Sequence, residues 1–388
     1  MNGFQPPAGF GLYVHWPFCL SKCPYCDFNS EPSRDIDQKR WRDAFVRELR
    51  QFGERTAGRR LDSVFFGGGT PSLMEPETVA VLLETAGEYW SYSDTVEITL
   101  EANPGAAEAE RFAAFHGAGV NRLSLGVQAL NDGDLRFLGR RHSAAEALQA
   151  IERAQTLFPR FSFDLIYARP DQEPSFWEDE LGRALEMCGG HLSLYQLSIE
   201  EGTPFATRLE RGAFTLPDEE TARVLWDITQ EMTTKAGLPA YEVSNHAAPG
   251  AESRHNLLYW RGGDYVGIGP GAHGRLTLDG RFIATARPLS PSEWMEKTEK
   301  GEDMTGDDVV LSAGERAEEL LMMGLRLDAG IDTVLFKEIC GRNIEDAVNT
   351  EKMSRLIEDG LLEPGTMLRV TPRGKPLLNA VLENLLTV

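Results

Sequence analysis

Long hydrophobic runs are absent from this sequence of 388 residues. No stretch reaches the roughly 18 uncharged apolar residues that a membrane-spanning helix requires. The opening residues, MNGFQPPAGFGLYVHW, contain neither a basic segment nor a long apolar one, so we expect no signal peptide. These absences argue against a membrane-spanning chain and favour a soluble protein located in the cytoplasm.

Cysteine and positive charge are also scarce. The chain has five cysteines, three of them close together near the N-terminus, which does not fit a disulfide framework and agrees with a reducing compartment. It has 39 lysines and arginines against 60 acidic residues, a net charge of −21. We therefore expect no extended surface for nucleic acid, although a local arginine cluster could still hold an anionic small molecule.

Short apolar segments that predict strands alternate with helix-length amphipathic segments in the first half of the chain. The strands are expected at residues 12–16, 63–66, 95–100, 122–125, 161–166 and 192–197. The helices are expected near residues 37–53, 76–90, 106–117, 143–157 and 175–188. This alternation predicts an α/β fold with a parallel sheet, open or curled into a partial barrel, whose functional residues lie beyond the C-terminal ends of the strands.

The pattern changes after about residue 205. A helix is expected at 217–236, and the glycine-rich segment HNLLYWRGGDYVGIGPGAHGR (255–275) predicts loops and short antiparallel strands. Further helices are expected near 291–300, 312–326, 332–340 and 344–358. The last two precede a hairpin, an order typical of a winged helix. Residues 305–388 contain 9 basic and 15 acidic residues, a local net charge of −6, which favours a packing or docking module over a DNA-binding one. The expected units are 1–205, 206–304 and 305–388.

The segment FCLSKCPYCDF places Cys19, Cys23 and Cys26 directly after the first predicted strand. Three thiolates at this spacing can hold three corners of a [4Fe–4S] cluster and leave its fourth iron open to a small molecule. The alternative is a zinc site completed by a histidine such as His15, although zinc sites usually have a second ligand pair and none follows here. His15 also falls in an alternating strand pattern that suits a core position.

Other polar motifs follow the next strands. GGGTPS (67–72) follows the second strand, EANPG (101–105) the third and GVQ (126–128) the fourth, while Asp164 lies within the fifth. The glycines allow close approach of a ligand to the backbone, or simply a tight connection from strand to helix. Because the carboxyl ends of parallel strands share one edge, these motifs should lie around a single opening.

The segment YVHWPFCLSKCPYCDF resembles the CxxxCxxC loop of the radical S-adenosylmethionine (SAM) superfamily. FFGGGTPS, EANP, SLGVQ, LGRRH and DLIYARP resemble, in this order over about residues 10–275, the oxygen-independent coproporphyrinogen III oxidase family. Within that family the chain looks most like the HemW-type heme chaperone branch. Phe28 stands where the oxidases have a second cysteine, Tyr13 lies near the start where they have an extension, and HNLLYW matches the HNxxYW motif of the branch.

The resemblance implies a partial (βα)6 radical SAM barrel, followed by a C-terminal α+β region with a winged-helix-like module. It implies a [4Fe–4S] cluster on Cys19, Cys23 and Cys26. It further implies that SAM, as one molecule or two, contacts Tyr13, Tyr25, Gly68, Gly69, Thr70, Glu101, Gln128, Arg140 and Asp164. The two tyrosines could equally belong to the core, and Glu101 could be an ordinary loop acid or a helix cap.

The resemblance also implies heme as a ligand. Neutral imidazole is a common axial ligand of heme iron, and His255 is the expected ligand, with Tyr259 and Trp260 as an apolar wall. His246 and His273 are rivals, and His255 could instead satisfy backbone groups in a loop. Arginines that could pair with the heme propionates lie nearby in sequence at Arg254, Arg261 and Arg275.

The expected function is therefore that of a heme chaperone, which holds heme and delivers it to an apo-protein, membrane-bound or not. A homodimer is left open, and no nucleic-acid partner is expected. The alternatives are a coproporphyrinogen III oxidase, which would decarboxylate propionates by radical SAM chemistry, and a radical SAM enzyme acting on another substrate. Phe28 and the short N-terminal segment argue against the oxidase, so no catalytic residue is assigned.

Overall fold

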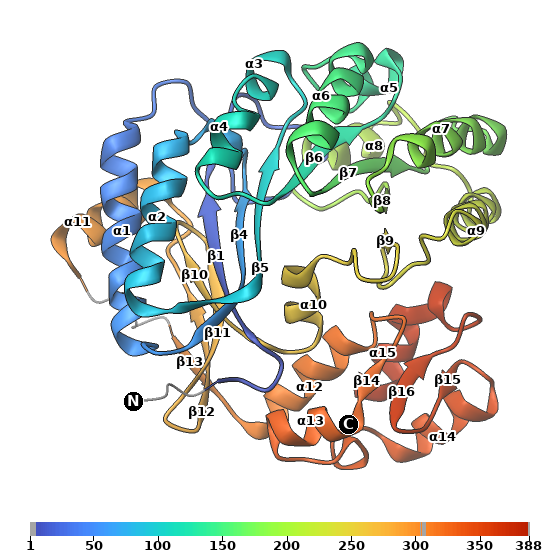
Figure 1. Ribbon diagram of the computed structural model, residues 1–388. Coiled ribbons are helices and arrows are strands. Elements are labelled where there is room, and N and C mark those ends of the chain that lie inside the picture. The colour runs from blue at the N-terminus through green and yellow to red at the C-terminus, as the bar shows by residue number, and fades with distance from the viewer. Residues whose placement is uncertain (1–4, 303, 305–307, 387–388) are drawn as a thin grey trace.

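The computed structural model describes residues 5–302, 304 and 308–386. Its centre is a mixed sheet of eleven strands (Figure 1). Six parallel strands form the middle of this sheet in chain order: β1 (Phe10–Trp16), β4 (Arg60–Gly68), β5 (Ser91–Ala102), β6 (Arg122–Gln128), β7 (Arg160–Tyr167) and β8 (His191–Gln196). They coincide with the six expected strands. The predicted parallel α/β core is confirmed, and the sheet curves without closing, since β1 and β8 each pair with a further strand.

Helices cover the outer face of the parallel strands (Figure 1). They are α1 (Gln38–Arg55), α2 (Pro76–Tyr89), α3 (Ala106–Ala109), α4 (Phe112–Gly117), α5 (Asp132–Phe137), α6 (Ala144–Leu157) and α7 (Pro174–Met187). The five expected helices are present, the third of them split into α3 and α4. Local sequence explains their starts: Ser143 and Glu146 form a capping box, and α2 and α7 begin with proline, whose fixed φ suits the first turn.

The sheet continues beyond both ends of the parallel core. β10 (Asp264–Ile268) pairs parallel with β1, and β11 (His273–Leu278), β12 (Arg281–Ala286) and β13 (Val309–Leu311) follow antiparallel. β9 (Asn245–Ala247) pairs antiparallel with β8. The expectation of loops and antiparallel strands for 255–275 is wrong in two respects, because the segment opens with helix α10 (Arg254–Trp260) and β10 is parallel. Seven residues are too few to show a helical period, and the pairing of β10 with β1 joins distant parts of the chain.

The remaining elements of the first 300 residues surround this sheet. They are β2 (Phe18–Cys19), β3 (Glu31–Pro32), a 3₁₀ turn at Pro71–Leu73, α8 (Pro204–Glu210), α9 (Glu219–Lys235) and α11 (Pro291–Lys300). α11 packs against α1, where Trp294 stacks on Trp41 with ring centroids 5.3 Å apart. Val266, Leu276 and Trp294 belong to the same hydrophobic core as the barrel strands. Residues 206–304 therefore share a core with residues 1–205.

The C-terminal unit has a hydrophobic core of its own, formed by buried residues between Ala317 and Leu385. Its elements are α12 (Ala313–Gly324), β14 (Ile331–Asp332), α13 (Thr333–Cys340), a 3₁₀ turn (Ile344–Asp346), α14 (Thr350–Glu358), β15 (Leu362–Glu363), β16 (Met367–Val370) and, after a 3₁₀ turn (Lys375–Leu377), α15 (Leu378–Leu386). The expected helix, helix and hairpin are present. The unit packs beneath the barrel next to α10, where Arg316 donates to the carbonyl of Gly262 over 2.5 Å. No helix in the described part of the chain has the length and apolar content to cross a bilayer.

Candidate cofactor site at the mouth of the barrel

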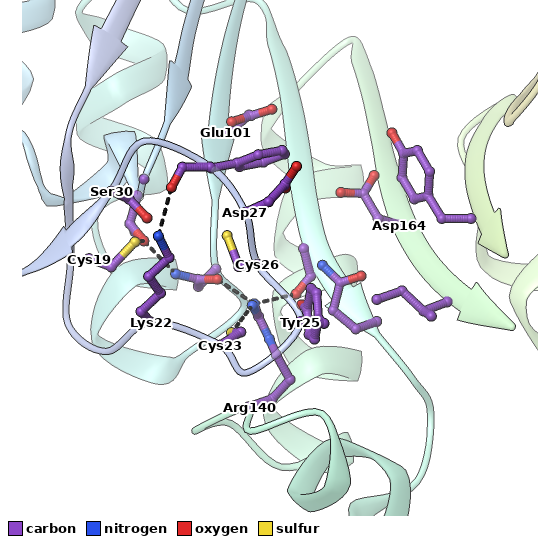
Figure 2. A pocket seen from close by; sticks show the side chains of 18 of the residues that line it. Cys19, Lys22, Cys23, Tyr25, Cys26, Asp27, Ser30, Glu101, Arg140 and Asp164 are labelled. Carbon is purple, nitrogen blue, oxygen red and sulfur yellow. Dashed lines mark hydrogen bonds between the residues drawn. The ribbon is translucent and has the colours of Figure 1, made fainter. Parts of the chain in front are cut away.

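The cysteine loop lies over the C-terminal ends of the parallel strands (Figure 2). Cys19 ends β2, and Cys23 and Cys26 lie in the turn that follows, where the amide of Cys26 donates to the carbonyl of Cys23 over 3.1 Å. All three are free thiols and partly exposed. Burial raises the pKa of both Cys19 and Cys26. Binding of a metal to these thiols would therefore have to release protons, which makes it pH-dependent.

A zinc ion and a cluster require different arrangements of the three thiols. Zinc needs its thiolate ligands about 2.3 Å from one point, whereas a [4Fe–4S] cluster binds each thiolate through a different iron. Within residues 5–302, 304 and 308–386, no three His, Cys, Asp or Glu side chains converge as ligands of one ion. His15 is not free to complete a zinc site, because Nδ1 hydrogen-bonds with the hydroxyl of Tyr13 over 3.0 Å and Nε2 with the carbonyl of Asn29 over 2.9 Å.

A chain of hydrogen bonds links two of the cysteines through Thr70 after β4, Asn103 after β5 and Arg140 between α5 and α6. Thr70 donates to Sγ of Cys19 over 3.4 Å and accepts from the side-chain amide of Asn103 over 3.1 Å. Arg140 donates to Sγ of Cys23 over 3.3 Å and also to the Asn103 side-chain oxygen (Figure 2). Asn103 thus joins Thr70 to Arg140. It was not among the predicted site residues, and the only signal for it was its position two residues after Glu101 in EANPG.

A cavity of about 390 Å³ lies between this loop and the strand ends. Eleven of the thirteen predicted site residues line it: Cys19, Cys23, Tyr25, Cys26, Gly68, Gly69, Thr70, Glu101, Gln128, Arg140 and Asp164. The expectation that the motifs share one opening is therefore met. Their contacts with SAM remain a prediction, and the two residues outside this lining are Tyr13 and His255.

Two carboxyl groups face the cavity from neighbouring sides (Figure 2). Burial raises the pKa of Glu101 to about 8, with a further contribution from the negative charge of Asp164. Burial also raises the pKa of Asp164 to about 6. The two acids share a confined space in which a negative charge is poorly solvated, so a cationic ligand between them would favour their ionised forms. A ligand with an ammonium or sulfonium group fits this requirement.

The glycine-rich turn packs closely on the cysteine segment. A Cβ at Gly69 would lie 2.6 Å from the carbonyl oxygen of Phe18, and one at Gly68, whose φ is +110°, would lie 2.7 Å from that of Trp16. The amides of Gly69 and Thr70 donate to these same two carbonyls. Both glycines therefore hold the cysteine segment against the end of β4 while their backbone borders the cavity.

Tyr13 lies on the interior face of the sheet below the cavity. Its ring stacks against Phe65 and His255, and burial raises its pKa far above the usual value. Tyr25 does line the cavity, and its ring packs on Phe205. The two tyrosines, which the sequence left equivalent, therefore occupy different surroundings.

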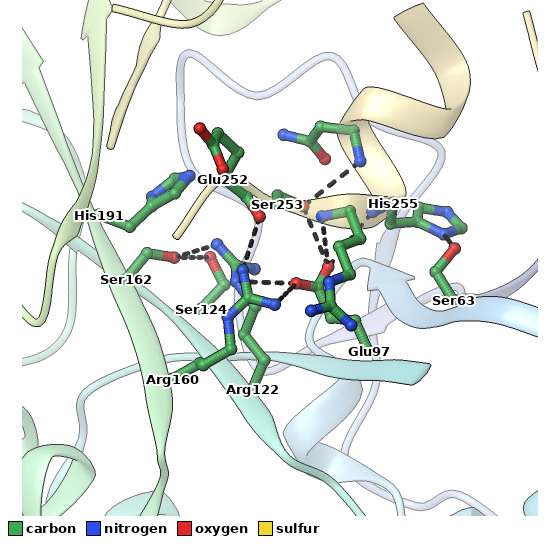
Figure 3. A network of polar contacts seen from close by, with 12 residues as sticks. Ser63, Glu97, Arg122, Ser124, Arg160, Ser162, His191, Glu252, Ser253 and His255 are labelled. Carbon is green, nitrogen blue, oxygen red and sulfur yellow. Dashed lines mark hydrogen bonds and ion pairs between the residues drawn. The ribbon is translucent and has the colours of Figure 1, made fainter. Parts of the chain in front are cut away.

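His255 lies at the opposite end of the barrel, where β1 and β4 begin. It is 1% exposed, and its Nδ1 hydrogen-bonds with Ser63 over 2.8 Å (Figure 3). Its Nε2 hydrogen-bonds with the hydroxyl of Tyr259 over 2.7 Å. Burial, with a contribution from Arg122, lowers its pKa to about 3. Neither ring nitrogen is free to bind iron in this arrangement. For His255 to be the expected heme ligand, α10 would have to leave the barrel.

A buried carboxylate fastens α10 across three strands (Figure 3). Glu97 in β5 accepts hydrogen bonds from the amides of Arg254 (2.9 Å) and His255 (3.2 Å) at the start of the helix. It also forms ion pairs with Arg160 over 2.8 Å and Arg122 over 3.8 Å. The ion pairs of Glu97 and its hydrogen bonds to the two amides together hold the start of α10 at this end of the barrel. Sequence reasoning did not identify Glu97, since a single acid in a strand carries no motif.

Comparison with known proteins adds a separate line of support. Residues 13–180 match the model of the radical SAM superfamily, and residues 311–377 match that of the HemN C-terminal domain. The chain is 37% identical to the heme chaperone HemW of Haemophilus influenzae, over 98% of both chains. It is also 37% identical to the heme chaperone HemW of Escherichia coli, over 97% of this chain and 98% of that one.

The chain is 44% identical to the bovine mitochondrial radical S-adenosyl methionine domain-containing protein 1, over 85% of this chain and 77% of that one. Among solved structures it resembles coproporphyrinogen III oxidase (HemN) of Escherichia coli, described as a radical SAM enzyme. That match has a TM-score of 0.81 at 22% identity and covers 98% of this chain and 89% of that one. At this identity the structural likeness shows a common fold.

Proposed function

The chain belongs to the radical SAM superfamily and, within it, to the family of the heme chaperone HemW, and from this premise we propose that it binds a [4Fe–4S] cluster, SAM and heme and delivers heme to acceptor proteins. The observation that carries the proposal is the 37% identity to two heme chaperones over almost the whole length of each chain. The three thiols at the mouth of the cavity agree with it.

The residues of the cavity have separate roles in this proposal. Cys19, Cys23 and Cys26 hold the cluster. When bound, the cluster supplies an iron atom without a protein ligand, at which the amine and carboxylate of SAM can be held. Glu101 and Asp164 offer carboxylates to the cationic part of SAM, and burial of the two acids makes that pairing stronger than it would be in water.

Other groups orient the two cofactors. Arg140 and Thr70 donate to cysteine sulfurs, and such donors to sulfur are among the features that set the potential of an iron–sulfur cluster. Gln128 borders the cavity from the end of β6, where its positive φ of 71° marks a sharp turn of the backbone. The backbone of Gly68 and Gly69 lies open to the methionine end of SAM.

We further propose that the acceptors are heme proteins that include membrane-bound ones, that delivery takes place in the cytoplasm, and that two chains can associate. The alternative of coproporphyrinogen decarboxylation shares the fold but lacks a specific observation in its favour. Phe28 occupies the position at which the oxidase family has a further cysteine, and this argues against it.

The proposal can be tested with anaerobically reconstituted protein. Hemin is added to the protein with SAM and reductant, and the loaded protein is mixed with heme-depleted membranes. We expect hemin bound to the protein to give a Soret band. We also expect heme to reach the membranes faster from the loaded protein than from free hemin. A parallel sample receives coproporphyrinogen III in place of hemin and should yield no vinyl product. Formation of that product, or no binding of hemin by the reconstituted protein, would contradict the proposal.

A further inference from the structure

Axial ligation of heme requires an imidazole nitrogen with a free lone pair and open space above it for a porphyrin. The chain has seven histidines, all within the described residues. Five of them are at most 8% exposed: His15, His142, His191, His246 and His255. A porphyrin cannot reach these side chains without unfolding the elements around them. Only His116 and His273 are exposed.

Four of the five buried histidines are also engaged in side-chain hydrogen bonds, whereas Nδ1 of His191 and of His246 is buried without a partner among the described residues. Both nitrogens of His15 and of His255 are bonded. His142 bonds to the carbonyl of Val127 over 3.0 Å, and His191 to the hydroxyl of Tyr241 over 3.0 Å. Each of these bonds would be lost if the ring turned toward a ligand. The exposed pair is therefore the better source of an iron ligand.

His116 belongs to α4 in the outer helical layer (Figure 1). Its ring lies edge-on against Phe158 with centroids 5.5 Å apart, on the side of the sheet away from the interior. It does not line the cavity at the mouth of the barrel, and it belongs to no cofactor motif. His116 is therefore an exposed histidine away from the mouth of the barrel, and its substitution can serve as the control for that of His273.

His273 lies beside the cysteine loop. It is the first residue of β11, and it shares a face with Arg275, which pairs with Tyr265 of β10. Tyr265 packs on Tyr259 within the barrel, with ring centroids 4.3 Å apart, so this face of β11 is the interior one. A Cβ at Gly271, two residues before His273, would lie 2.3 Å from the side chain of Asn29, so β11 begins beside the cysteine loop. No hydrogen bond to the His273 ring exists among the described residues.

The rim near His273 combines apolar surface with a cation. The side-chain amide of Asn29 donates to the carbonyls of Pro270 (3.0 Å) and Leu289 (2.9 Å), which joins the cysteine loop to the segment before β11 and to the one after β12. On either side of this junction Phe28 is 57% and Leu289 is 65% exposed. Lys22 is exposed and donates to the carbonyl of Phe28 over 2.8 Å. Large apolar side chains left in water are unfavourable until something covers them.

We propose that heme binds at this rim, with His273 as the axial ligand of its iron, its porphyrin face over Phe28 and Leu289, and a propionate toward Lys22. Heme matches these groups in kind, since it is flat and apolar, carries anionic propionates and takes imidazole at its iron. Partial burial, with Arg275, lowers the pKa of His273, which keeps the imidazole neutral near pH 7. The inference rests on the proposed function, which requires heme to bind this chain.

The position has a consequence for the cofactor cavity. Phe28 also lines that cavity, so heme on this rim would lie next to SAM. Occupancy of the cavity could then affect the binding of heme through a shared side chain. The large ring at position 28, in place of a thiol, supplies the apolar contact that heme requires.

The test compares single variants of the full-length, reconstituted protein titrated with hemin. For His273→Ala we expect loss of the imidazole-type axial signal in electron paramagnetic resonance and at least tenfold weaker binding, with the signal restored by added imidazole. His116→Ala should behave as the wild type does. Lys22→Ala and Leu289→Ser should weaken binding severalfold and keep the axial signal. Unfolding curves of each variant verify that it is folded.

The outcomes separate the inference from the function beneath it. If His273→Ala binds hemin with the wild-type affinity and axial signal, the inference is overturned while the proposed function stands. The same holds if a folded His255→Gln variant alone loses that signal. If the wild-type protein does not bind hemin at all, the proposed function fails, and the inference fails with it.

Discussion

Replacing Glu97 by glutamine should destabilise the barrel strongly, although the substitution is nearly isosteric. The side chain has no exposed surface, and its partner Arg122 is only 4% exposed. The amide oxygen of glutamine can still accept from the amides of Arg254 and His255, so helix capping is largely kept. What is lost is the negative charge between two arginines. We expect the free energy of unfolding to fall by about 3–5 kcal/mol, the usual cost of leaving a buried charge unpaired.

The measurement can be restricted to the relevant core. All seven tryptophans lie at or before residue 294, so their fluorescence reports mainly unfolding of the barrel, although Trp260 also contacts Arg326 of the C-terminal unit. Denaturant unfolding followed by tryptophan emission therefore gives the change in barrel stability. Glu220→Gln is the matched control, because it breaks an exposed pair with Arg223 over 3.0 Å on α9, and its midpoint should not change measurably.

A double variant tests whether charge is the cause. Glu97→Gln combined with Arg122→Gln removes the carboxylate and one of its two arginines while Arg160 remains, and it should lose less stability than the sum of the two single variants. A loss below about 1 kcal/mol for Glu97→Gln, as for an exposed pair, would refute the reasoning. Strict additivity in the double variant would refute it equally.

Three further predictions concern the mouth of the barrel. Cys23→Ser should abolish the iron–sulfur absorbance and leave the circular dichroism of the fold intact; global unfolding would show that the cluster is needed for folding. Because burial raises the pKa of Glu101 from 4.5 to about 8, the cluster-free protein should lose stability as pH rises from about 5 to 8. Glu101→Gln should reduce this dependence of the free energy of unfolding on pH, measured by urea unfolding at each pH. An unchanged dependence would contradict the prediction. Gly69→Ala should lower both the melting temperature and the cluster content, since its Cβ would lie 2.6 Å from the Phe18 carbonyl oxygen. A variant with the wild-type melting temperature and cluster content would argue against close packing there.

Local pattern was sufficient to predict the parallel core. Each parallel strand is a short apolar segment buried on both faces, and each is followed by a helix with an amphipathic period, so strand, helix and order along the chain are all local properties. The grouping of Cys19, Glu101 and Asp164 around one cavity followed from the general rule for the carboxyl ends of parallel strands. The C-terminal helices and hairpin were predicted for the same reason.

The features that escaped prediction depend on contacts between distant segments. β10 joins β1 across some 250 residues of sequence, and nothing in its own composition selects a parallel edge. Asn103 gains its role only because Thr70 and Arg140 arrive on either side of it. The sequence placed His255 and His273 as rivals in one glycine-rich segment, because composition alone does not separate them.

The sequence by itself therefore determined the element types, their order and the family to which the chain belongs, since motifs and periodicity are written in neighbouring residues. Only the tertiary structure decided which end of the barrel each histidine occupies. His255 is closed in by Glu97 and Ser63 at the start of the strands, whereas His273 stands open beside the cysteine loop. The physical reason is that accessibility and free lone pairs depend on what the folded chain brings around a side chain.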